Sequence, residues 1–190
     1  MTKKAENLNQ KLAHSLEALL EELFPPTVWD DSATATAQRF VRYLSEYVPM
    51  PEPDFALTTF ASRAKQIIVV RDIEFSSVCC HHLLPFFGKA HVAYLPDSHI
   101  IGLSKIPRLV EFHARRPQTQ ERLTEDVAKH LKKLLNASGT ACIIESVHTC
   151  MSCRGVRKVG ASMVTSEMRG IFLTNADARH ELLSLISLSR

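Results

Sequence analysis

Residues 66–96 read QIIVVRDIEFSSVCCHHLLPFFGKAHVAYLP, and this stretch decides the fold class. Its first part, residues 66–79, is rich in the β-branched and aromatic residues that are typical of strands. In residues 88–96 the apolar side chains recur with the period of two that a half-buried strand requires: Ala90, Val92 and Tyr94. The two parts predict a β-hairpin.

Helices are expected on both sides of this hairpin. Upstream, leucines recur at helical spacing over residues 8–23, and a second helix covers roughly residues 32–47. Downstream, a short strand leads into a helix at about residues 105–115. Pro117 suits the first position of a long helix that ends near Asn136.

Two further strands are predicted at residues 140–150 and 160–167, and Asn175 is expected to cap a last helix. Segregated strands and helices of this kind indicate an α+β fold with an antiparallel sheet. We expect a helical extension over residues 1–50, followed by the main domain over residues 51–190.

The composition narrows the class of protein. A chain of 190 residues suits one domain or one subunit of an assembly, and its net charge of +3 is too mild to indicate a nucleic-acid partner. We find no apolar run near the ~20 residues of a membrane helix, and no apolar region behind the first lysines that would mark a secretory signal. Five cysteines, an odd number, argue against a disulfide framework and favour reduced thiols in a cytoplasmic protein.

Four residues of metal-binding type stand in a row at the end of the first predicted strand: Cys79, Cys80, His81 and His82. Side chains alternate between faces along a strand, so the four cannot all reach one ion. Cys79 and His82 are separated by two residues, which lets both converge where the strand ends in a turn. A further ligand then has to come from the second cluster, residues 148–153 (HTCMSC), at the end of another predicted strand.

Spacing alone leaves two interpretations of these clusters open. In the first, Cys79, His82 and Cys150 form a catalytic zinc site that keeps a fourth position open for water. His81 and His148 are then left for proton transfer. In the second, the Cys-x-x-Cys pair of the later cluster joins two ligands of the first in a closed structural site. A structural site does not need the additional histidines, and this favours the open site.

Basic residues near both clusters favour a phosphorylated substrate. Lys105 and Arg108 lie one turn apart at the start of a predicted helix, directly after Ser104. Helix N-termini with nearby cations favour phosphate. The second cluster is followed directly by further cations: Arg154, Arg157 and Lys158.

Four segments of the chain, in order, resemble the GTP cyclohydrolase I family: CCHHLLPFFGKAHVAYLP, IIGLSKIPRLVEFHARRPQTQERLT, VHTCMSCRGV and SEMRGIF. The resemblance implies a tunnelling fold (T-fold), in which strands and helices of several subunits assemble into a β-barrel. It also implies a decamer of two pentamers with active sites at subunit interfaces. The reaction that it implies converts GTP and water into 7,8-dihydroneopterin triphosphate and formate, towards folate or biopterin.

The resemblance assigns roles to matching positions, with Zn²⁺ as the cofactor. Its metal ligands are Cys79, His82 and Cys150. The acid–base roles fall on His81, His148 and Ser104. The resemblance also implies the substrate contacts. Gln120 and Glu121 are expected to bind the guanine edge. The ribose or the phosphates are expected to be bound by five cations: Lys105, Arg108, Arg154, Arg39 and Arg42. The last two arginines are expected to reach the phosphates from a neighbouring subunit.

One departure from the family pattern bears on function. The usual motif is Cys-Glu-His-His, whereas here Cys80 holds the second position. A carboxylate beside the metal ligands is thus replaced by a small thiol. The alternatives are therefore a paralogue that acts on another purine nucleotide or a formamidopyrimidine nucleotide, or one that stops after ring opening. A non-enzymatic, zinc-stabilised binding module is a third hypothesis.

Overall fold

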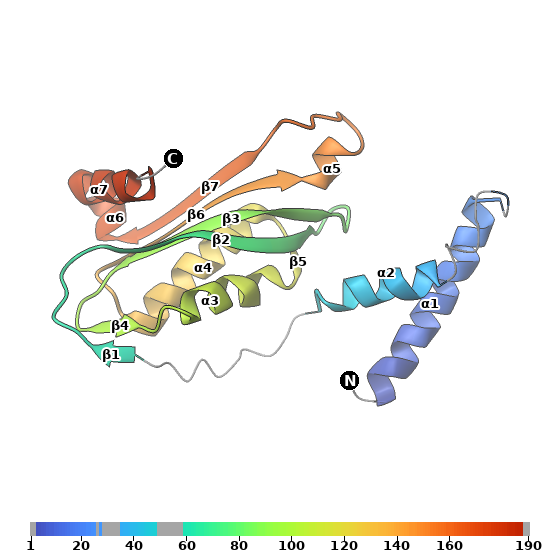
Figure 1. Cartoon of the computed structure of the whole chain (residues 1–190), viewed down its shortest axis with the longest axis horizontal. Helices are drawn as coiled ribbons and strands as arrows, with labels where there is room; N and C mark the ends of the chain where they lie inside the picture. Colours follow the sequence, from blue (N-terminus) through green and yellow to red (C-terminus); the bar gives the residue numbers. More distant parts are fainter. Residues whose placement is uncertain (1–2, 26, 28–34, 49–58, 188–190) are drawn as a thin grey trace. The chain divides into compact units, whose positions relative to one another are not determined.

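The computed structural model describes residues 3–25, 27, 35–48 and 59–187, and the chain divides into two compact units, Met1–Val48 and Pro49–Arg190 (Figure 1). The sequence predicts a boundary two residues later, between residues 50 and 51. That the second unit is the catalytic domain stays a prediction.

The first unit is a pair of helices, α1 (Lys3–Leu23) and α2 (Thr36–Ser45). They pack through small and branched apolar side chains: Ala13, Ala37 and Val41, with Leu16 and Leu20 at the margin. The helix predicted over residues 8–23 is confirmed. Part of the second predicted helix, residues 32–34, lies outside the described residues. Arg39 and Arg42 are both exposed on α2.

The second unit is built on a five-stranded sheet in the order β5-β2-β3-β6-β7. Four antiparallel strands follow one another in this sheet: β2 (Ile68–Cys79), β3 (Pro85–Leu95), β6 (Gly139–His148) and β7 (Met163–Gly170). The short β5 (Pro117–Gln118) pairs in parallel with the end of β2. A separate ribbon joins β1 (Thr59–Ala61) to β4 (His99–Ile101). The predicted hairpin and the α+β class are confirmed.

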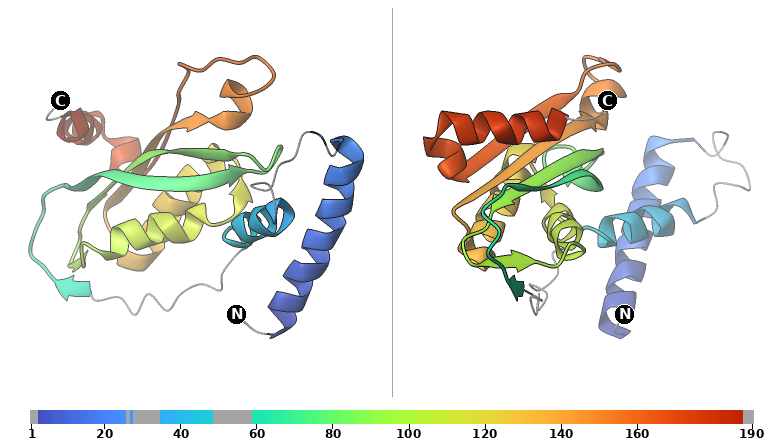
Figure 2. Two further views of the ribbon diagram at one scale, coloured as in Figure 1. Left: turned by 45° about the vertical axis from the view of Figure 1, so that its right-hand side comes forward. Right: turned by 60° about the vertical axis from the view of Figure 1, so that its left-hand side comes forward.

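Helices cover the two faces of the sheet unequally (Figures 1 and 2). The helices α3 (Lys105–Ala114) and α4 (Gln120–Leu135) pack on one face and bury the main core. On the other face lie α6 (Ile171–Thr174) and α7 (Ala176–Ser187), which cover a smaller cluster around Phe172 and Leu182. As predicted, Asn175 caps α7, because its Oδ1 accepts from the backbone N–H of Ala178 (2.9 Å).

The predicted start of the long helix is wrong. Pro117 does not begin α4 but lies in β5, opposite Val78 of β2. The helix begins at Gln120, after the N-cap Thr119, whose hydroxyl accepts from the backbone N–H of Arg122 (3.3 Å). Pairing with β2 overrides the local preference of proline for a first helical turn, and it places Gln118 in the core.

One of the five cysteines lies deep in the core. None of the five cysteines forms a disulfide, and Cys142 is completely buried in β6. Burial raises the pKa of the Cys142 thiol, and the nearby Glu167 carboxylate raises it further, so the thiol is protonated and inert. Within the described residues, none of the helices combines the length and the apolarity that crossing a bilayer requires.

A buried histidine pair joins α3 to α4. The imidazole Nε2 of His113 lies 2.9 Å from Nδ1 of His130, and the Arg116 guanidinium donates to Nδ1 of His113 (3.0 Å). Because a guanidinium only donates, His113 accepts at Nδ1 and donates from Nε2. Burial, His130 and the Arg116 cation lower the pKa of His113 to about 4, while the Asp126 carboxylate opposes them. His113 is therefore neutral in the folded chain at pH 7.

This pair predicts acid sensitivity. The unfolded chain, with a histidine pKa of about 6.5, binds a proton that the folded chain excludes, so the free energy of unfolding falls as pH drops from 6.5 towards 4. Between pH 7.5 and pH 5 the loss attributable to His113 is roughly 2 kcal/mol. In His113→Gln, residue 113 keeps a donor for His130 but does not titrate. Over the same pH range, its free energy of unfolding, measured in urea, should therefore fall by about this amount less than that of the unaltered chain. His180→Gln, at an exposed position on α7, serves as the control and should behave as the unaltered chain does.

Candidate functional site

A tight turn after β2 folds the first metal-ligand cluster back on itself. The backbone N–H of Cys79 donates to the carbonyl of Leu84 (2.9 Å), and the N–H of Leu83 donates to the carbonyl of Cys79 (2.8 Å). Leu83 adopts a left-handed conformation (φ 54°), which closes the turn. As a result, the side chain of His82 lies close to that of Cys79, three residues earlier in the sequence.

The second cluster arrives beside this turn through the pairing of β3 with β6. His148, the last residue of β6, lies opposite Phe86 of β3. The chain then enters the single-turn helix α5 (Thr149–Ser152), where the Thr149 hydroxyl donates to the Pro85 carbonyl (2.6 Å). This places Cys150 next to the end of β2.

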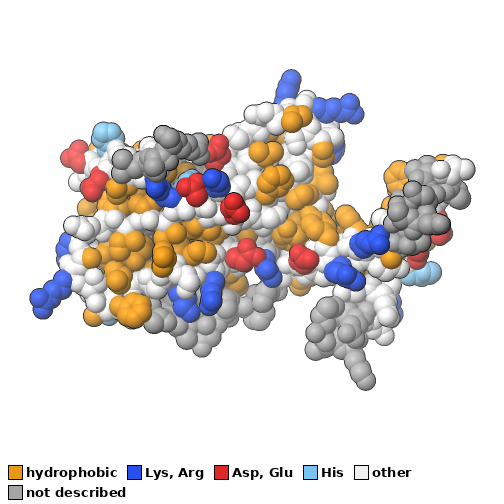
Figure 3. Space-filling view, viewed as in Figure 1, with side chains coloured by type: hydrophobic (Ala, Val, Ile, Leu, Met, Phe, Trp, Pro, Cys, Tyr) orange, Lys and Arg blue, Asp and Glu red, His pale blue; other side chains and the backbone are white. Residues whose placement is uncertain are grey.

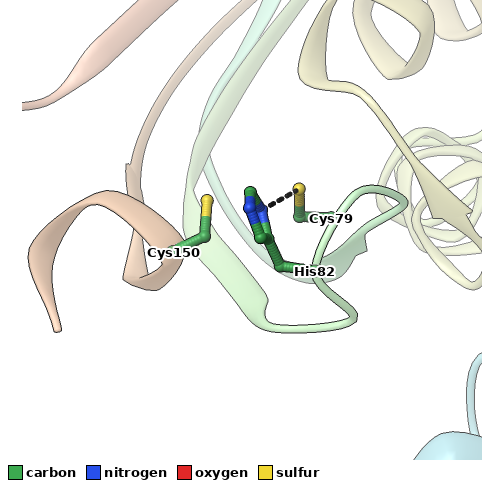
Figure 4. A group of neighbouring side chains, drawn as sticks. All are labelled: Cys79, His82 and Cys150. Atoms are coloured by element: carbon green, nitrogen blue, oxygen red, sulfur yellow. Dashed lines mark hydrogen bonds between the residues drawn. The ribbon is translucent and has the colours of Figure 1, made fainter. Parts of the chain in front are cut away.

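Three side chains converge at this point: Cys79, His82 and Cys150 (Figure 4). Their ligand atoms all lie within 4.8 Å of one another, and Cys79 Sγ is 3.8 Å from His82 Nδ1. Ligands of a tetrahedral zinc ion lie about 3.5–3.8 Å apart, given bond lengths of about 2.0–2.3 Å. The thiolate and imidazole donors and their spacing therefore fit Zn²⁺.

The same geometry favours the open site over the closed one. Cys79 is buried and Cys150 is half-buried, whereas His82 is exposed, so one side of the group faces solvent. In the part of the chain that the structure describes, this is the one group of histidine, cysteine and acidic side chains with metal-binding spacing, and Cys153 is not part of it. Cys153 is exposed beyond α5. Among the described residues, no fourth protein ligand joins the group.

Both histidines expected to transfer protons lie close to this group. His81 is exposed, and its Nδ1 is 3.7 Å from Cys79 Sγ. His148 stacks on Phe86, with ring centroids 4.6 Å apart and planes 1° from parallel. Burial lowers the pKa of His148, and the Glu121 carboxylate opposes this shift. Glu121 is itself exposed, at the start of α4.

Gln120 has an unexpected environment. Its side chain is completely buried, and its amide oxygen lies 2.9 Å from His148 Nε2. The sequence predicts a contact with substrate here, and that role stays a prediction. What the structure adds is a direct link between α4 and the histidine at the end of β6, which sequence patterns did not indicate.

The structure does not bring the predicted phosphate ligands of α3 together with the metal-ligand group in one chain. The C-terminal end of α3 lies near the site, because the Ser77 hydroxyl donates to the Ala114 carbonyl (2.7 Å). Ser104 and Lys105 lie at the opposite end of this ten-residue helix, which is about 15 Å long. Arg108 follows one turn later and is exposed.

Arg154, by contrast, belongs to the end of the sheet that carries the metal-ligand group. It lies in an exposed segment between α5 and β7 together with Arg157 and Lys158. Basic side chains project from this segment in the space-filling view (Figure 3). Cations are therefore available near the group for an anionic ligand.

Several residues that shape the site were missed from the sequence. Phe86 supplies the stacking surface for His148, and Ser146 and Thr165 bond to the amide of Gln120. Phe86 gave no signal, because it is set opposite His148 by the pairing of β3 with β6, two strands that lie far apart in the sequence. Thr165 gave no signal, since its contact depends on how α4 packs against β7.

Comparison with known proteins agrees with this geometry. The sequence profile of the family described as GTP cyclohydrolase I matches residues 8–187. The chain belongs to the GTP cyclohydrolase I family. Its α+β unit is accordingly a tunnelling fold of that family.

Individual members of the GTP cyclohydrolase I family are similar over most of the chain. The GTP cyclohydrolase 1 of Campylobacter jejuni (strain 81-176) is 53% identical over 128 residues, which is 67% of either chain. The Rhodopirellula baltica protein of that name is 47% identical over 160 residues, or 83% of this chain and 70% of its own. The Aquifex aeolicus protein of that name is 46% identical over 151 residues, or 80% and 82%.

The open-site geometry makes a prediction about metal content. Cys150→Ser and Cys79→Ser should each abolish retention of zinc after dialysis, because two ligands hold the ion far more weakly than three. Cys153→Ser should retain about one zinc per chain, as the unaltered protein does, since its thiol lies outside the group. The zinc content of each variant, measured by plasma mass spectrometry, decides between the open and the closed site. Loss of zinc in Cys153→Ser would instead support the closed four-ligand site.

Proposed function

We propose that this chain is a zinc-dependent hydrolase that opens the imidazole ring of GTP at C8, releases formate and forms 7,8-dihydroneopterin triphosphate. The observation that carries the proposal is the convergence of Cys79, His82 and Cys150 beside His148, in a chain of the GTP cyclohydrolase I family. When bound by these three residues, zinc supplies an activated water near neutral pH. The remaining steps are assigned to side chains of the protein.

Proton transfer is assigned to the two histidines. His81, exposed beside Cys79, donates a proton to N7 of the purine so that the ring can open. His148 then acts as acid and base while the ribose opens and rearranges, helped by Ser104. Closure of the rearranged ribose onto the freed amine completes the pterin. His148 suits this task because its ring is held in a fixed plane against Phe86.

Substrate binding is assigned to charged side chains around the group. The Glu121 carboxylate accepts from the N–H donors of the guanine edge and so orients C8 towards the metal. The triphosphate is bound by charge-assisted hydrogen bonds from Lys105, Arg108 and Arg154. Arg39 and Arg42 complete the residues that we assign to the nucleotide, and Gln120 acts beside it through its contact with His148.

The separation along α3 supports an active site shared between subunits. The metal-ligand group lies near the C-terminal end of α3, whereas Ser104 and Lys105 lie at the start of this helix, which is about 15 Å long. A nucleoside triphosphate bound at the group is therefore better served by Ser104 and Lys105 of a second copy. We propose a homo-oligomer, a decamer of two pentamers, with α2 of a neighbour supplying its arginines, and a location in the cytoplasm on the route to folate or biopterin.

Cys80 is the observation that favours a second candidate. It is exposed directly between the ligand Cys79 and His81, and its backbone N–H donates to the carbonyl of Gln118 (3.1 Å). The backbone is thus fixed while the thiol faces outward, where the family pattern has a carboxylate. A thiol in place of the carboxylate favours a paralogue that takes another purine or formamidopyrimidine nucleotide, or that stops after ring opening.

The proposed function predicts which products form from GTP. Zinc-loaded protein incubated with GTP should release formate and form a fluorescent pterin in equal amounts, measured by separate assays. Formate without pterin would identify an enzyme that stops after ring opening. Neither product with GTP, but turnover of another purine nucleotide, would support the second candidate. Absence of turnover with every nucleotide, in protein that retains zinc, would favour the binding module.

A further prediction concerns residue 80, where a thiol stands in place of the carboxylate of the family pattern. Cys80→Glu restores a carboxylate beside the ligands and should raise kcat/KM for GTP by about 10-fold, the size of effect that one charge in a site can have. Cys80→Gln is the matched control, because it has the same shape without the charge. Equal values of kcat/KM in the two variants would show that charge at residue 80 does not determine specificity.

A further inference from the structure

The amide of Gln120 is held in one orientation. Its Nε2 faces three groups: the carbonyls of Ile144 and Met163, each at 3.1 Å, and the Thr165 hydroxyl at 3.0 Å. A backbone carbonyl can only accept a hydrogen bond. The NH₂ group of the amide must therefore point at these two carbonyls, and a flipped amide would set oxygen against oxygen.

The amide oxygen consequently faces the end of β6. It lies 2.5 Å from the Ser146 hydroxyl and 2.9 Å from Nε2 of His148. An amide oxygen only accepts, so Nε2 of His148 must carry the hydrogen. A neutral imidazole has one N–H, and which nitrogen carries it is set by the hydrogen bond that the ring makes. Nδ1 is then the nitrogen with the lone pair.

The rest of the surroundings fix this arrangement. The Thr124 hydroxyl donates to the backbone carbonyl of Gln120 (2.8 Å) and lies 2.6 Å from the Thr165 hydroxyl. Phe86 holds the plane of the His148 ring from the other side. Turning the ring over would break the bond to Gln120 and leave its buried amide oxygen with the Ser146 hydroxyl as its remaining partner.

We propose that Gln120 is a positioning residue that holds the His148 ring in one orientation with its hydrogen on Nε2, so that Nδ1 is the ring nitrogen left for the substrate. The assignment rests on the proposed function for the identity of the substrate but not for the tautomer.

Neutron diffraction from crystals of the unaltered, zinc-loaded protein tests the tautomer without any turnover. We expect a deuteron on Nε2 of His148, in the hydrogen bond to the Gln120 amide oxygen. A bare Nε2 overturns the proposal. If GTP proves not to be the substrate, this result still stands, so the two failures can be told apart.

Kinetics separates positioning from substrate contact. Gln120→Met has similar length but no acceptor, and it should lower kcat about 10- to 100-fold, part of what a general acid–base group contributes, with KM for GTP within about twofold. If the amide binds guanine instead, KM rises and kcat is kept, which contradicts the proposal. Should Gln120→Met fail to fold, the neutron result decides alone.

The matched control is Thr140→Val. It also removes a buried hydrogen bond between β6 and α4, from Thr140 Oγ1 to the Ala128 carbonyl (2.9 Å), but at the far end of the strand. A general loss of contact between these elements would lower kcat in both variants alike, and this outcome counts against a specific role for Gln120. If kcat is retained in Thr140→Val but lowered in Gln120→Met, the result supports the positioning role of Gln120.

Discussion

The pairing of β3 with β6 is the constraint on which the site depends. Ten consecutive residue pairs fix the register from Leu95 and Gly139 to Phe86 and His148. The strands meet closely at Gly88, where an added Cβ would lie 2.0 Å from the Glu145 carbonyl oxygen. A slip of one residue would turn every side chain of β6 to the opposite face, which would remove His148 from Phe86 and Cys150 from the metal-ligand group.

Periodic and local features could be read from the sequence. The alternation in residues 88–96 is enough to place β3, and the Cys-His spacing at 79–82, together with a second soft-ligand cluster, is enough to indicate the metal group. These features are local because strand period and turn closure are set by neighbouring residues. The cap at Asn175 belongs to the same class, since it involves residues only three apart.

Features that depend on packing could not be read in this way. Pro117 has a strong local preference for a helix start, but two strand pairings with β2 outweigh it. Gln120 looks like an exposed polar residue of a first helical turn, and only the packing of α4 on β6 and β7 shows that it is buried and fully bonded. The distance between Ser104 and the metal-ligand group likewise follows from the direction of α3, which no residue pattern specifies.

The turn after β2 has a consequence for how the protein is made. During synthesis the run Cys79-Cys80-His81-His82 leaves the ribosome well before Cys150, and in an extended chain its four side chains are equivalent soft ligands. Closure of the turn and arrival of β6 remove that equivalence, because among the described residues Cys79 and His82 are the two of the run that form a group of metal-binding spacing with Cys150. The three-residue group is therefore complete only once β6 has paired with β3, a contact between strands that lie far apart in the sequence.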